Sequence, residues 1–87
     1  MSEVTTIHVV RGVRIAVTDV GNGLYLARLK FDDMAFAARV GPDGEISGMA
    51  KGSPGQGHEF EETDWLPDEL QKAMRDAVRA RRAQDKG

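Results

Sequence analysis

The chain has 87 residues, 40% hydrophobic and 30% charged, which is typical of one small globular domain and not of a disordered chain. It contains no cysteine, and this excludes a disulfide framework and a thiolate zinc site. No basic and apolar leader pattern is present, and no apolar run approaches the ~18 residues of a membrane span, so we expect a cytoplasmic protein with no membrane partner.

The net charge of −2 hides a strong asymmetry along the chain. Residues 1–58 are neutral overall, residues 59–69 carry −6, and residues 70–87 carry +4. Any electrostatic function is therefore expected in the last third of the chain.

Residues 5–51 alternate between apolar and polar side chains, which is the period of half-buried strands. Turn residues divide this region into expected strands at 5–10, 13–18, 24–31, 34–40 and 45–51. Gly21-Asn22-Gly23 is typical of a tight hairpin, and 41–44, Gly-Pro-Asp-Gly, fits a type I turn. Because every connection is short, two to five residues long, the strands are predicted to form an antiparallel meander.

The fifth expected strand is the weakest, since it contains Gly48 and few apolar residues. These features predict an unprotected edge strand at 45–51, with Met49 available to a partner. Edge strands pair readily with another chain, so a homodimer is a further expectation.

Residues 52–65 read as a flexible and then acidic connector, and residues 66–84 as one amphipathic helix. Thr63 or Asp64 is the expected helix cap, and Trp65 is expected to anchor the helix entry in the core. The apolar face of the helix comprises Leu66, Leu70, Ala73, Met74, Ala77 and Val78, with Arg81 near its boundary. The predicted fold is a single α+β domain over 1–87: a curled, four- to five-stranded antiparallel meander followed by a C-terminal helix packed on one sheet face.

Catalytic and cofactor patterns are missing from the sequence. The two histidines, His8 and His58, have no serine partner in a nucleophile motif. The glycines of 52–58 match no phosphate-binding fingerprint, and the acidic stretch after them lacks the ligand ladder of a calcium loop. We therefore expect no enzyme activity, no cofactor and no metal.

Two charged surfaces remain as candidates. The acidic segment supplies possible partner-binding residues, which with Met49 are Glu59, Glu61, Glu62 and Asp64. The outer face of the helix carries five possible nucleic-acid-binding cations: Lys72, Arg75, Arg79, Arg82 and Lys86. Arg28, Lys30 and Arg39 would widen this second patch if their face is exposed.

The favoured interpretation is a non-enzymatic protein-binding module, an adaptor or inhibitor of a larger assembly. One alternative is nucleic-acid binding through the cationic face of the helix. A second is an acidic mimic of nucleic acid that occupies the basic groove of a nucleic-acid-binding enzyme.

Overall fold

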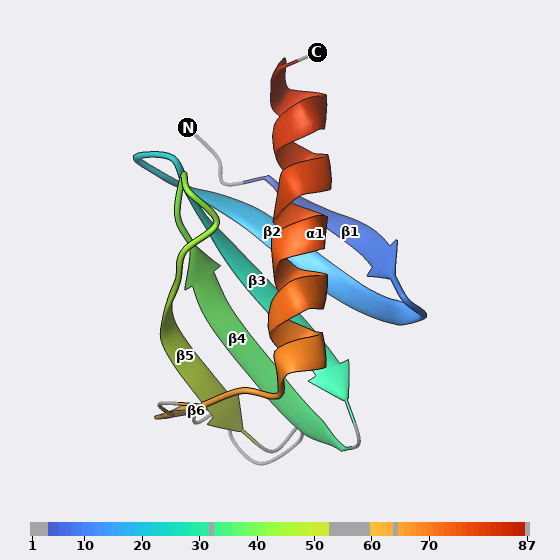
Figure 1. The fold of residues 1–87 in the computed structure, drawn as a ribbon, viewed down its shortest axis with the longest axis vertical. Helices are drawn as coiled ribbons and strands as arrows, with labels where there is room; N and C mark the ends of the chain where they lie inside the picture. The colour runs from blue at the N-terminus through green and yellow to red at the C-terminus, as the bar shows by residue number, and fades with distance from the viewer. Residues whose placement is uncertain (1–3, 32, 53–59, 64, 87) are drawn as a thin grey trace.

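The computed structural model describes residues 4–31, 33–52, 60–63 and 65–86. They form one antiparallel sheet whose strands follow chain order, with a single helix lying across one face (Figure 1). The elements are β1 (Thr5–Val10), β2 (Val13–Gly21), β3 (Leu24–Phe31), β4 (Met34–Val40), β5 (Ile46–Gly52), β6 (Phe60–Glu62) and α1 (Asp68–Lys86). The predicted α+β meander with a C-terminal helix is confirmed, with one strand more than expected.

Two hairpins turn on pairs of residues with positive φ. Arg11 and Gly12 (φ 53° and 79°) join β1 to β2, and Asn22 and Gly23 (φ 58° and 77°) join β2 to β3. Positive φ at both central residues defines a type I′ turn, whose twist matches that of the flanking strands. These turns determine which residues of β1, β2 and β3 lie opposite each other.

The connection between β4 and β5 is the predicted proline turn. The Gly44 amide donates to the Gly41 carbonyl at 3.0 Å, with Pro42 at the second position. The Gly41 amide also donates to the Glu45 carbonyl at 2.8 Å, which closes the loop into β5.

The prediction that 45–51 is an edge strand is wrong. β6 pairs with β5 through Ala50 opposite Glu62 and Lys51 opposite Glu61, so β5 lies inside the sheet. The Thr63 amide extends this pairing by donating to the Met49 carbonyl at 2.9 Å. β6 has three residues, too few to show an alternating pattern in the sequence. In the described part of the chain, the edges of the sheet are β1 and β6.

The helix begins at Asp68, slightly later than expected, and its first turn is closed by a backbone carbonyl. The Pro67 carbonyl accepts from the amides of Leu70 (3.0 Å) and Gln71 (3.1 Å). Thr63 is not the cap: its hydroxyl accepts from the Trp65 amide at 3.3 Å, which forms a local turn. Asp64, the other expected cap, lies outside the described residues.

The core lies between α1 and the sheet face that it covers, and α1 contacts β1, β2, β3 and β4. All six residues assigned to the apolar face of the helix are buried. Trp65 is 67% exposed, so the expected core anchor is wrong, and the adjacent Leu66 is fully buried instead. α1, the single helix in the described ranges, is not apolar enough to cross a lipid bilayer.

Candidate interaction surfaces

Arg82, expected to bind nucleic acid, is bound to the protein's own backbone. Its guanidinium donates to the carbonyls of Pro42 (2.6 Å), Gly23 (3.0 Å) and Gly41 (2.5 Å), and lies 5.3 Å from the centre of the Tyr25 ring. Arg82 therefore ties two hairpin loops to α1.

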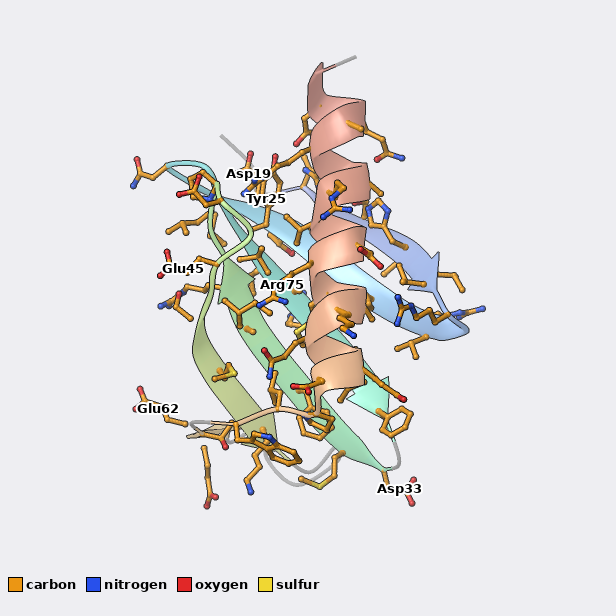
Figure 2. All side chains as sticks on the ribbon, viewed as in Figure 1. Asp19, Tyr25, Asp33, Glu45, Glu62 and Arg75 are labelled. Carbon is orange, nitrogen blue, oxygen red and sulfur yellow. The ribbon has the colours of Figure 1, made fainter. Side chains whose placement is uncertain are left out.

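The remaining cations of the helix stripe differ in their surroundings. Arg75 extends from α1 toward the β4–β5 loop and donates through Nε to the Gly44 carbonyl at 3.0 Å (Figure 2). Arg79 lies 3.8 Å from Asp76, and Lys72 is exposed. The side chain of Lys86 is not among those that the structure describes. The predicted stripe is therefore not a continuous row of cations available to a ligand, because several of its side chains already contact other parts of the protein.

A groove of about 560 Å³ lies between α1 and the β4–β5 loop. Arg75, Arg79 and Arg82 line it together with Asp43 and Glu45, so both signs of charge face the same space. Because positive and negative side chains both line the groove, its charge favours neither an anionic nor a cationic ligand.

The acidic surface is described only in part. Glu61 and Glu62 are exposed on β6, and Glu62 lies at the edge of the sheet opposite β1 (Figure 2). Glu59 and Asp64 lie outside the described residues. Met49 is half-buried and packs against the core, so less of it is available to a partner than expected.

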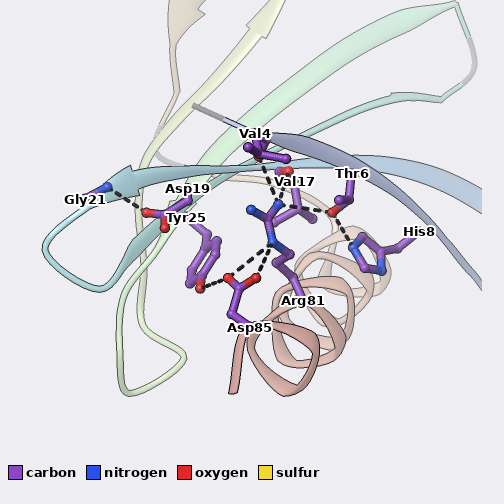
Figure 3. Close-up of polar contacts among 9 residues, drawn as sticks. All are labelled: Val4, Thr6, His8, Val17, Asp19, Gly21, Tyr25, Arg81 and Asp85. Atoms are coloured by element: carbon purple, nitrogen blue, oxygen red, sulfur yellow. Dashed lines mark hydrogen bonds and ion pairs between the residues drawn. The ribbon is translucent and has the colours of Figure 1, made fainter. Parts of the chain in front are cut away.

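A buried arginine, which the sequence placed only near the apolar boundary, joins α1 to β1 and β2. Arg81 is 5% exposed, and its Nη1 donates to the Val17 carbonyl (3.0 Å), the Val4 carbonyl (3.0 Å) and the Thr6 hydroxyl (3.1 Å) (Figure 3). The Thr6 hydroxyl also lies 2.8 Å from Nε2 of His8. These contacts hold the first strand against the helix.

Asp85 completes this network one helical turn further on. Arg81 Nε lies 3.1 Å from its Oδ1, and the Tyr25 hydroxyl donates to its Oδ2 at 2.7 Å. The hydrogen bond from Tyr25, followed by that from Arg81, lowers the pKa of Asp85. The hydrogen bond to Asp85, followed by burial, raises the pKa of Tyr25. Because the polar atoms satisfy one another, we interpret the network as structural. The sequence signal for it was an arginine beside the apolar face with an aspartate four residues later.

β1 is a free edge strand with apolar side chains on the face away from α1. Ile7 is 61% exposed and Val9 is 67% exposed. The two-residue Arg11-Gly12 turn makes Val10 and Val13 a hydrogen-bonded pair. In an antiparallel pair of strands, hydrogen-bonded and non-hydrogen-bonded pairs alternate. The backbone N–H and C=O groups of Thr5, Ile7 and Val9 therefore point away from β2. β1 thus presents backbone donors, backbone acceptors and apolar side chains together.

The sheet face opposite α1 carries a group of cations, which we call the sheet-face cations: Arg14 on β2, Arg28 and Lys30 on β3, and Arg39 on β4. All four are exposed, and the register places them opposite the face that contains Val17, Leu29 and Val40. They therefore do not widen the cationic stripe of the helix, which lies on the other side of the molecule.

Within the described ranges, no group of three or more histidine, aspartate or glutamate side chains is arranged to hold a metal ion. The architecture is that of a small α+β domain in which α1 covers one sheet face and no described element covers the other, which we call the bare sheet face. No protein-family model, curated protein or solved structure matches the chain. Functional inference therefore rests on the surfaces described above.

Proposed function

We propose that the chain is a non-enzymatic protein-binding module that receives an extended segment of another protein at β1. The supporting observation is the combination of an unpaired strand edge with the exposed side chains of Ile7 and Val9. Strand addition uses main-chain hydrogen bonds for affinity and alternate side chains for specificity. The bound segment would run along Thr5, Ile7 and Val9 and place apolar side chains beside the last two.

β1 lacks the features that usually protect an edge strand. It contains no lysine, no proline and no register shift against β2. Protected edges carry such features because an open edge pairs with other chains. The opposite edge, β6, has only three residues, and Glu61 and Glu62 are two of them. The two edges thus differ in length and charge, which favours β1 as the docking edge.

A selection from a random peptide library tests this proposal even while the partner is unidentified. The expected peptides are extended and carry β-branched or aromatic residues at alternate positions. Their binding should be lost in Ile7→Lys, which puts a charge on the docking edge, and kept in Ser47→Lys. Ser47 is exposed on the same sheet face but lies on β5, so this control adds the same charge away from the edge.

Two results would count against strand addition at β1. One is that no peptide binds; the other is that the selected peptides bind Ile7→Lys as tightly as the unmodified protein. Sedimentation equilibrium of the protein alone tests the other occupant of this edge, a second copy of the chain. If the protein forms a dimer and Ile7→Lys dissociates it, then β1 pairs with a second copy of the chain. That result would overturn the proposal that β1 receives a segment of another protein.

A further inference from the structure

We propose that the bare sheet face binds the phosphodiester backbone of nucleic acid through the sheet-face cations, independently of the proposed docking of a segment at β1. Their arrangement carries the inference. Arg28 and Lys30 are two residues apart on β3, a separation of roughly 6.6–6.8 Å along the strand. Arg14 and Arg39 lie on the strands to either side, so the four charges form a compact group.

The sheet-face cations are not neutralised by the described part of the protein. None of the four forms an ion pair there, although Arg11, Arg79 and Arg81 do. Glu62 lies on the same row of the sheet as Arg28, with Ala37 and Ala50 between them. Three strand spacings separate the two positions by roughly 14 Å, which exceeds the Debye length of about 8–10 Å at ordinary salt.

This concentration of like charges costs folding stability. Because Ile15 lies opposite Leu29 in an antiparallel pair, the preceding residue Arg14 comes opposite Lys30 on the neighbouring strand. Like charges directly opposite each other in a sheet are destabilising. A bound anionic partner would offset that repulsion, and this explains physically why the cations could be grouped on one face.

Small neighbours leave the cations accessible. Arg28 lies between Ala16 and Ala37 on its row, and Lys30 lies opposite Ala35. Arg39 extends over Gly48 on β5, where an added Cβ would approach its Nη1 to 3.4 Å. Arg28 and Lys30 therefore rise from a floor of short residues, whereas Val9 lies opposite Arg14 and Leu26 lies opposite Arg39.

The composition of this face favours phosphate over an acidic protein surface. Protein interfaces depend on buried aromatic or large apolar anchors. Alanines flank Arg28 and lie opposite Lys30, and the larger apolar neighbours of the group are Val9, opposite Arg14, and Leu26, opposite Arg39. Three of the four cations are arginines, whose planar guanidinium binds phosphate in a bidentate manner. Because no described aromatic side chain accompanies them, base stacking is not expected, and binding should be independent of base sequence.

Fluorescence anisotropy with labelled single-stranded and double-stranded oligonucleotides tests the inference at about 50 and about 200 mM salt. Four phosphate contacts predict a slope of log affinity against log salt of about −3.6 for a duplex, or on the order of 10²-fold weaker binding across that range. Binding of either form supports the proposal, since both present phosphodiesters. No binding to either form at low salt would overturn it.

Two double variants with the same change in net charge locate the binding surface. Arg28→Gln with Lys30→Gln should weaken binding by on the order of tenfold or more and reduce the magnitude of the salt slope by about 2. Lys72→Gln with Arg79→Gln, on the outer face of α1, should leave affinity almost unchanged. The reverse pattern would assign binding to the helix stripe and overturn the assignment to the sheet face. Circular dichroism confirms that both variants are folded.

Competition with a polyglutamate peptide of matched charge separates phosphate from carboxylate. Weak competition supports recognition of phosphodiesters. Displacement of the oligonucleotide at equal charge concentration would overturn the proposal in favour of an acidic protein partner. Ile7→Lys, which tests the proposed docking edge, adds a cation on the row of Arg28 and should keep or strengthen oligonucleotide binding while it abolishes peptide binding. Failure of one proposal is therefore distinguishable from failure of the other.

Discussion

Consecutive arginines on α1 bind backbone carbonyls in different parts of the sheet. Arg81 joins the helix to β1 and β2 from a buried position, whereas Arg82 holds the loops that contain Gly23 and Pro42. Each guanidinium also lies within 6 Å of the Tyr25 ring centre, at 5.7 and 5.3 Å. At the scale of single residues, the C-terminal half of α1 is fastened by directional contacts as well as by apolar packing.

Arg81→Ala is expected to lower the free energy of unfolding by about 2–3 kcal/mol, because the Val17 carbonyl and the Thr6 hydroxyl lose a charged donor. Arg79→Ala is the matched control: it lies two residues earlier on the same helix, is exposed, and should change stability by less than about 0.5 kcal/mol. Urea unfolding followed by circular dichroism measures both. Equal effects of the two substitutions would contradict the structural role of Arg81.

Asp85 is expected to contribute to loss of stability in acid. Its pKa is below the ordinary 3.8 in the folded protein, so around pH 4 the unfolded chain binds more protons than the folded protein. The contribution is therefore fully present above that pH and is lost as the pH falls through the lowered pKa. Thermal unfolding between about pH 7 and about pH 2 should show this decline. Asp85→Asn should flatten it, and an unchanged pH profile in that variant would refute the assignment.

At the scale of elements, one irregularity shapes the interior of the sheet. Ala37 lies opposite Ala50 and Arg39 opposite Ser47, so two residues of β5 face the single residue Ala38. Gly48 has φ 57° at this position, which is typical of a β-bulge that begins with glycine. The bulge keeps Met49 against the core and gives Arg39 a site without a side chain to lie over.

Gly48→Ala is expected to destabilise the protein by about 1–2 kcal/mol, because an L-residue with a Cβ is strained at positive φ. Gly41→Ala is the control, since its added Cβ would meet Leu24 at an ordinary 3.6 Å without positive φ. That substitution should change stability by less than about 0.5 kcal/mol. Chemical denaturation compares the two, and a smaller cost at Gly48 than at Gly41 would contradict the bulge argument.

At the scale of the whole molecule, one core joins the helix to the sheet. α1 covers a single face, and the buried residues of both elements belong to one cluster. A meander of this size is marginal without such a cover. We therefore expect the helix and the sheet to unfold together as one cooperative unit.

Met74→Ala should destabilise the whole domain by about 3 kcal/mol, because Met74 on α1 is fully buried against the sheet and its truncation leaves a cavity. Met34→Ala should cost about 1 kcal/mol, since Met34 is only partly buried at the start of β4. Circular dichroism reports the helix, and hydrogen exchange at β3 reports the sheet. Separate transitions for the two probes would contradict a single cooperative unit.

The sequence by itself determined the local structure, because turns and periodicity depend on neighbouring residues. The Asn22-Gly23 hairpin, the Pro42 turn and the buried face of α1 around Met74 followed directly from these patterns. Only the tertiary structure decided that β6 covers β5, that Trp65 is exposed and that Arg81 is buried. It also placed Arg28 and the cations of α1 on opposite sides of the molecule. These properties depend on contacts between residues far apart in the chain, and periodicity carries no information about which distant segment covers which face.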